Sequence, residues 1–164
     1  MNCPACGRTL TEITVSGLAV DVCRGGCGGI WFDQLELVKA DDQEETAGET
    51  LLDIERDPAV TVDANARRRC PRCREIVMLR HFYGPKQKVE VDECGKCGGI
   101  WLDAGELAAI RSEYRSHAER HDAAHGFAKS VFGKMLSESA PGGASADPHL
   151  AQFGRIVRFV WPKH

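Results

Sequence analysis

The chain has 164 residues, of which 43% are hydrophobic, and its formal net charge is -3. This length allows one ordinary domain or several small ones. No apolar run reaches the length of a membrane span, and Cys3 leaves no room for an export signal ahead of it. We therefore expect a cytoplasmic protein without a membrane partner, in a reducing compartment where thiols are not oxidised to disulfides.

All eight cysteines fall into four close pairs, and the pairs form one pattern written twice. The first copy, in residues 1–40, contains Cys3, Cys6, Cys23 and Cys27. Between its two pairs, alternating apolar residues around Ser16-Gly17 predict two short strands joined by a tight turn. Such a hairpin brings four sulfurs to the corners of a tetrahedron, which suits Zn²⁺. The second pair has three residues between its cysteines, and we expect its glycines to absorb the extra one.

The residues after the second pair of each copy match at every position but one. The two runs are Cys27-Gly-Gly-Ile-Trp-Phe-Asp33 and Cys97-Gly-Gly-Ile-Trp-Leu-Asp103. We expect Trp31 and Trp101 to pack on the hairpins as core, rather than to serve as exposed anchors for a partner. Each aspartate is predicted to cap a helix, with Glu36 or Glu106 three residues later in an Asp version of the capping box.

Residues 41–66 are predicted to form an acidic linker. Residues 41–63 contain nine acidic groups and one basic group, whereas residues 64–102 contain nine basic and four acidic groups. The stretch after position 40 is too polar and acidic to bury. We expect it to screen the basic second module, or to compete with an anionic partner for that module.

The second copy, in residues 67–105, contains Cys70, Cys73, Cys94 and Cys97. Residues 76–82 and 89–91 are predicted to be its two strands, joined by a turn at Tyr83-Gly-Pro-Lys86. Four more residues separate its cysteine pairs than in the first copy. We expect two of them in each strand, because a shift of two keeps the inward and outward faces in phase.

Residues 106–139 are predicted to be an amphipathic helical region, with a stripe of Phe127, Val131 and Met135 near its end. Gly126 and Gly133 are expected to weaken this helix and to split it. His117, His121 and His125 share one helical face, which is read either as a transition-metal site or as an ordinary polar face. Residues 140–164 are predicted to be a flexible linker and an apolar tail.

Four thiolates fill the coordination shell of Zn²⁺, which leaves no position for water or substrate and indicates structural metal. The sequence therefore predicts two zinc ions, one in each module, each needed for its module to fold. Tetrahedral sulfur also accepts iron, so a rubredoxin-like electron carrier is an alternative. A sensor that releases zinc when its thiolates are oxidised is another.

The quoted motifs resemble a bacterial family of zinc ribbons that is named for its similarity to the N-terminal ribbon of transcription factor IIB. The resemblance covers about half of the chain and implies a small metal-stabilised fold. It implies two tandem rubredoxin-like zinc ribbons, each a β-hairpin with zinc knuckles, followed here by a C-terminal α-helix. Ribbon 1 is residues 1–40 and ribbon 2 is residues 67–105. Activity does not follow from such a fold.

Basic and aromatic residues of ribbon 2 are the candidates for binding a partner, because they suit a phosphate backbone and stacked bases. They are Arg67, Arg68, Arg69, Arg72, Arg74, Arg80, Phe82, Tyr83, Lys86 and Lys88. A solvated charged face is the alternative reading. No phosphate-binding loop, nucleophile triad or carboxylate pair stands out, and no small-molecule substrate is evident. We predict a non-enzymatic protein that contacts nucleic acid or a protein of the gene-expression machinery.

Overall fold

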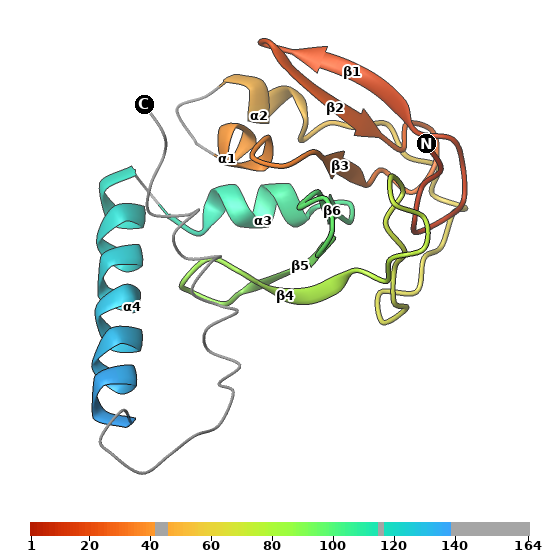
Figure 1. The fold of residues 1–164 in the computed structure, drawn as a ribbon. Coiled ribbons are helices and arrows are strands. Elements are labelled where there is room, and N and C mark those ends of the chain that lie inside the picture. Colours follow the sequence, from red (N-terminus) through yellow and green to blue (C-terminus); the bar gives the residue numbers. More distant parts are fainter. Residues whose placement is uncertain (42–45, 115–116, 139–164) are drawn as a thin grey trace. The chain divides into compact units, whose positions relative to one another are not determined.

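The computed structural model describes residues 1–41, 46–114 and 117–138 (Figure 1). Contacts divide the chain into two units. The ribbon unit consists of Met1–Tyr83 and Lys88–Glu113, and the helical unit consists of Gly84–Gln87 and the chain from Tyr114 onward. In the part of the chain that the structure describes, no helix has the length and hydropathy of a membrane span.

Ribbon 1 contains the predicted hairpin. Strands β1 (Thr11–Val15) and β2 (Leu18–Val22) pair antiparallel, and a third strand, β3 (Ile30–Phe32), pairs with β2. Both turn residues have positive φ, 51° at Ser16 and 79° at Gly17. A two-residue turn of this hand matches the right-handed twist of the strands, which confirms the predicted turn.

Ribbon 2 repeats this arrangement with β4 (Leu79–Tyr83), β5 (Val89–Glu93) and β6 (Ile100–Leu102). Both hairpins have five paired positions, so the prediction of longer strands is wrong. Three of the four extra residues lengthen the turn, and the fourth lies between Cys73 and β4. Extra turn residues add little closure entropy, whereas longer strands would extend past their neighbours in the sheet.

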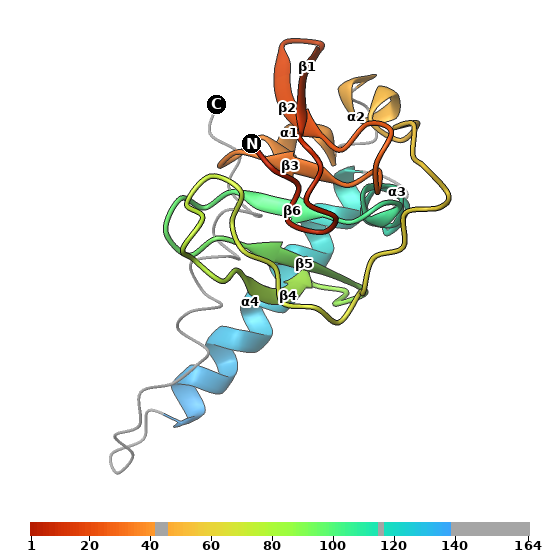
Figure 2. The ribbon, with the colours of Figure 1, turned by 90° about the vertical axis from the view of Figure 1, so that its right-hand side faces the viewer.

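The two ribbons form one six-stranded sheet in the order β1-β2-β3-β6-β5-β4 (Figure 2). The junction is the antiparallel pair of β3 and β6, in which Trp31 lies opposite Trp101. The repeated Ile-Trp-hydrophobic segment of one ribbon therefore pairs with its own copy in the other. The tandem repeat closes on itself with approximate twofold symmetry.

The sheet separates two layers of core. Trp31 and Trp101 lie on the same side as the cysteines, and Ile30, Phe32 and Leu102 lie on the other side, because side chains alternate along a strand. Short helices cover this second side: α1 (Leu37–Ala40), α2 (Thr46–Thr50) and α3 (Glu106–Ser112). The buried apolar residues that they contribute are Leu37, Ala40, Ala47, Leu107 and Ile110, and the buried Leu51 follows α2 directly.

The segment predicted as an acidic linker is part of the ribbon unit wherever the structure describes it. Ala47 and Leu51 are buried in the core. Gly48 lies so close to the carbonyl of Ala40 and the guanidinium of Arg111 that an added Cβ would approach both within about 2 Å. The prediction followed the acidic composition of this segment and overlooked its few apolar residues. These residues are enough to pack one turn of helix against α1 and α3.

The helical unit contains α4 (His117–Glu138). It runs through Gly126 and Gly133, so the prediction that these glycines split the helix is wrong. An interior glycine costs about 1 kcal/mol relative to alanine, which a long helix tolerates. Ala124 and Val131 of α4 are buried and Phe127 is half-buried, whereas the side chain of Met135 and residues 139–164 lie outside the described part.

Candidate metal centres

The first group of four cysteines gathers as predicted. Sγ of Cys3 lies 3.4 Å from Sγ of Cys27, and Sγ of Cys6 lies 3.4 Å from Sγ of Cys23. All four sulfurs lie within 4.8 Å of one another. Two of these cysteines precede β1 and two follow β2, so the hairpin sets the distance between the knuckles.

The second group consists of Cys70, Cys73, Cys94 and Cys97. Its sulfurs also lie within 4.8 Å of one another, with 3.7 Å between those of Cys70 and Cys97. Sulfurs about 2.3 Å from a tetrahedral zinc ion are separated by about 3.8 Å, so both groups fit the ion. Among the described residues, these are the two groups of three or more potential ligands that the fold brings together.

Backbone N–H groups point at the sulfurs, as expected for thiolates whose charge must be stabilised. Sγ of Cys3 accepts hydrogen bonds from the backbone N–H of Ala5 and of Cys6, both at 3.4 Å. In ribbon 2, Sγ of Cys70 accepts one from the N–H of Cys73 at 3.2 Å. The Cys-Pro-x-Cys turn therefore positions two ligands and supplies donors to one of them.

The close approach of the sulfurs in ribbon 1 shifts the pKa values of its cysteines in opposite directions. The thiol of Cys3 donates to Cys27, which raises the pKa of Cys3 and lowers the pKa of Cys27 to about 5. Burial raises the pKa of Cys23 to about 11. A zinc ion would take the place of these shared protons, so metal binding is expected to release protons.

Each tryptophan also orients the acidic residues that follow it. The indole N–H of Trp31 donates to Oδ1 of Asp33 at 3.1 Å, and Oε2 of Glu36 accepts from the backbone N–H of Asp33 at 2.7 Å. In ribbon 2 the equivalent distances, to Asp103 and Glu106, are 2.8 and 2.7 Å. The glutamate half of the predicted capping box forms, but the aspartate carboxylate binds the indole instead of capping the helix.

Each tryptophan lies over the second glycine of the other ribbon, which the sequence analysis missed. A Cβ added to Gly29 would lie 2.2 Å from Cζ2 of Trp101, and one added to Gly99 would lie 2.1 Å from Cζ2 of Trp31. Both tryptophans are 1% exposed. The sequence contains a signal for this contact, because a Gly-Gly pair repeated before the same tryptophan indicates close approach by another residue.

Arg68 was predicted as a surface cation, but it is 2% exposed. Its Nη2 lies 2.6 Å from Oδ2 of Asp103, and its Nε lies 3.9 Å from Oδ2 of Asp92. Arg80 binds the same Asp92 carboxylate, at 3.1 Å. Arg68 and Arg80 therefore neutralise the buried Asp92 and the half-buried Asp103 inside ribbon 2, and Arg68 does not fit a phosphate-contacting role.

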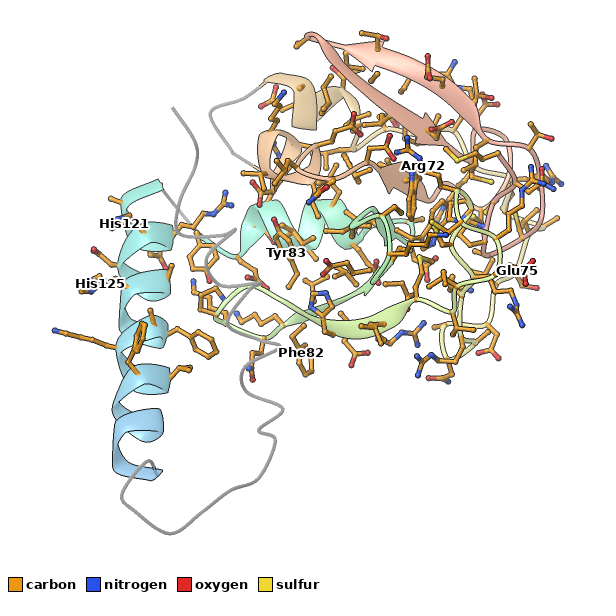
Figure 3. The ribbon with its side chains drawn as sticks, viewed as in Figure 1. Arg72, Glu75, Phe82, Tyr83, His121 and His125 are labelled. Carbon is orange, nitrogen blue, oxygen red and sulfur yellow. The ribbon has the colours of Figure 1, made fainter. Side chains whose placement is uncertain are left out.

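The other predicted binding residues differ in exposure. Arg67, Arg69, Arg72, Arg74, Phe82 and Lys88 are exposed, although Arg67 and Arg69 also donate to the carbonyls of Met78 and Glu75, at 3.0 and 3.3 Å. Tyr83 is not free to stack, because it is half-buried and its hydroxyl donates to Asp41 at 2.5 Å. In the helical unit, Nζ of Lys86 lies 2.9 Å from Oε1 of Glu119 and 4.1 Å from the ring centroid of Tyr114. Phe82 and Tyr83 point to opposite sides of β4 (Figure 3).

The histidine stripe stays a prediction. His121 and His125 are exposed and lie on the same side of α4 (Figure 3), as their spacing of four residues requires. Neither belongs to a group of three potential metal ligands among the described residues. The side chain of His117 lies outside that part of the chain.

A hairpin with four cysteines in two knuckles, present twice, defines a protein of two tandem zinc ribbons, and both groups can hold a zinc ion. The chain belongs to the family described as "Transcription factor zinc-finger", whose model matches residues 2–41 and 69–113, just over half of the chain. Each matched segment contains one group of four cysteines.

Two known proteins are similar in sequence to part of this chain. They are DNA topoisomerase 1 of Escherichia coli (strain K12) and DNA topoisomerase 1 of Salmonella typhimurium (strain LT2). Each is 32% identical to this chain in an alignment over 111 residues that covers 65% of this chain. The chain spans 12% of the length of these relatives. No solved structure matches the chain.

Proposed function

We propose that this protein is a non-enzymatic module that binds nucleic acid through the exposed cations of ribbon 2, with a structural zinc ion in each ribbon. The cytoplasmic location expected from the sequence stays part of this proposal. One observation carries the binding function: four exposed arginines lie on the segments that hold Cys70 and Cys73. They are Arg67, Arg69, Arg72 and Arg74.

Ribbon 1 provides an internal comparison for these arginines. When Cys70 is aligned with Cys3, the positions of Arg69, Arg72 and Arg74 correspond to Asn2, Ala5 and Gly7. The fold of the knuckle therefore does not require basic residues there. Structural roles account for only part of them: Nη1 of Arg72 lies 2.8 Å from Oδ1 of Asp33, yet the Arg72 side chain is still 56% exposed.

Phe82 favours single-stranded over double-stranded nucleic acid. It is 47% exposed, and the alternation along β4 places it on the same face of the sheet as Arg80. An exposed ring offers a stacking surface to an unpaired base, whose face is hidden in a duplex. The names of the two relatives are those of enzymes that act on DNA, which supports DNA as the first nucleic acid to test.

The test is the binding of a fluorescently labelled single-stranded oligonucleotide by the zinc-loaded protein, measured by anisotropy at several salt concentrations. In Arg69→Glu/Arg74→Glu we expect affinity at low salt to fall at least about tenfold, with a shallower salt dependence because phosphate contacts are lost. Phe82→Ala should weaken binding to the single strand more than binding to a duplex. Arg68 is left unchanged because it is buried.

A matched control separates a local site from general electrostatics. Arg24→Glu/Lys39→Glu changes the net charge equally, and both residues are exposed on ribbon 1. The control should retain most of the affinity. If it loses as much as the ribbon 2 variant, or if the native protein shows no salt-sensitive binding to DNA or RNA, the proposed function is wrong.

A further inference from the structure

The knuckle between Cys23 and Cys27 of ribbon 1 is paired with a segment from outside its ribbon. We name Glu55–Asp57 the strap. The backbone N–H of Gly25 donates to the carbonyl of Glu55 at 2.8 Å, and the N–H of Asp57 donates to the carbonyl of Gly26 at 2.9 Å. These bonds form a parallel bridge between Gly26 and Arg56. The residues of the knuckle that bind the strap, Gly25 and Gly26, lie in its longer three-residue gap.

Side chains close the strap onto the knuckle. Arg8 donates to the carbonyl of Gly25, and its Nη2 lies 3.0 Å from Oδ2 of Asp57. The glycines of the knuckle make room for this contact. A Cβ on Gly28 would lie 3.1 Å from Cβ of Arg56, and one on Gly26 would lie 3.1 Å from Cδ of Arg8.

The corresponding knuckle of ribbon 2, between Cys94 and Cys97, has a shorter gap and is more exposed to solvent. In ribbon 1, Gly26, Cys27 and Gly28 are buried. In ribbon 2, Lys96 is exposed, and Cys97 and Gly98 are only half-buried. Within the described ranges, the backbone bonds of this knuckle stay inside ribbon 2, namely Cys94 N–H to Gly99 and Gly98 N–H to Cys94.

We propose that the strap slows metal exchange at the first site, that of ribbon 1. The second site, in ribbon 2, therefore takes up and loses its metal ion faster. An incoming ligand or metal must reach a thiolate as the knuckle opens. In ribbon 1 the strap must first detach from Gly25 and Gly26, whereas in ribbon 2 the knuckle that carries Cys97 opens into solvent. The proposal concerns rates, so it holds whether or not the protein binds nucleic acid.

Metal exchange in the full-length protein tests the proposal while both sites stay filled. The zinc-loaded protein is mixed with excess Cd²⁺ of an NMR-active isotope, and each cadmium resonance is assigned by its coupling to the β-protons of its own cysteines. We expect the resonance coupled to Cys94 and Cys97 to appear at least about tenfold faster than that coupled to Cys23 and Cys27. Equal rates, or faster exchange in ribbon 1, would overturn the proposal.

Two variants connect the difference to the strap. Arg8→Ala removes the bonds to Gly25 and Asp57, and we expect exchange at the first site to accelerate by about three- to tenfold. Asp57→Ala removes the carboxylate that binds Arg8 and that also accepts from the N–H of Ala59, and we expect an acceleration of about threefold. The controls are Glu75→Ala, which is the position equivalent to Arg8 in ribbon 2, and the neighbouring Asp53→Ala. Unchanged exchange at the first site in both strap variants, or equal acceleration at both sites, would contradict the role of the strap.

Discussion

The two ribbons share one framework and differ in what is attached to it. Both have five-residue hairpin strands, four clustered sulfurs and the same Trp-Asp-Glu hydrogen bonds. Ribbon 1 adds the strap on its longer knuckle. Ribbon 2 adds a cluster of the buried Arg68 with Asp92 and Asp103, and exposed arginines around Cys70 and Cys73. The shared residues account for folding, so the unshared ones are the place to look for function.

The comparison also shows that the two ribbons share one sheet, so we expect neither to fold independently. β3 and β6 pair at the centre of one sheet, and each tryptophan lies on a glycine of the opposite ribbon. A forty-residue ribbon has little core of its own. The internal repeat supplies a second copy of the same surface, which buries both tryptophans at once.

The largest expected effect is the loss of one metal site. A structural zinc contributes about 10–16 kcal/mol, which is similar to the total stability of most domains. We expect Cys23→Ser, in ribbon 1, to remove native structure from ribbon 2 as well, since the two share the sheet. The measurement is the amide NMR spectrum of the protein with zinc in excess.

The mirror variant sharpens this result. Cys94→Ser, in ribbon 2, should likewise unfold β1, β2 and β3. If Cys23→Ser instead keeps the native resonances of β4, β5 and β6 and binds one equivalent of zinc, the ribbons fold independently and the shared sheet contributes little.

A smaller effect is expected from filling the contact between the ribbons. Gly99→Ala places a methyl group against Trp31, and Gly29→Ala places one against Trp101. Overpacking of this kind costs about 1–3 kcal/mol, and at Gly29 the added Cβ would also lie 2.9 Å from the carbonyl oxygen of Leu102. Because the contacts are reciprocal, we expect both variants to lose about 3 kcal/mol, measured by chemical denaturation of the zinc-loaded protein.

Two further variants identify the cause of that loss. Trp31→Leu should recover part of the stability of Gly99→Ala but none of that of Gly29→Ala. Gly126→Ala, in α4, meets no atom within 4 Å and should leave the ribbon unit unchanged. Native stability in Gly99→Ala would mean that the tryptophans are not held as closely as the structure places them.

The cysteines, hairpins and buried tryptophans could be predicted because each depends on neighbours in the sequence. Ligand spacing, a two-residue turn and alternating apolar residues are local patterns. The pairing of β3 with β6 was not predicted, because edge pairing depends on which strand ends are left uncovered after folding. The repeated Gly-Gly before tryptophan pointed to a close contact, but not to the partner.

The roles of charged residues were the least predictable part of the chain. Arg67, Arg68 and Arg69 are consecutive and chemically identical, yet Arg68 is buried while the other two are exposed. Alternation in an extended segment separates them, and Asp92 and Asp103 come from distant positions. Likewise, Asp57 looked like one more acid of a linker until the fold placed it beside Arg8.

The smallest expected effect concerns the pH dependence of stability, in which the two ribbons should differ in degree. Burial raises the pKa of Glu106 to about 7 and also raises that of Glu36, its counterpart in ribbon 1. A carboxyl whose pKa is higher in the folded state binds more protons there. Its contribution to stability is therefore full below the unfolded pKa and falls as the pH rises through about 7.

Glu106→Gln should remove the loss of stability at high pH, because the amide oxygen can still accept from the N–H of Asp103 and carries no charge. Above pH 7 we expect the variant to be more stable than the native protein by about 1–2 kcal/mol, allowing for partial exposure of the carboxyl to water. The advantage should shrink towards pH 6, and Glu36→Gln should show a smaller one. Denaturation midpoints of the zinc-loaded proteins between pH 6 and 8.5 measure it. A variant that is less stable at every pH would mean that the Glu106 carboxylate stabilises ribbon 2 despite its burial.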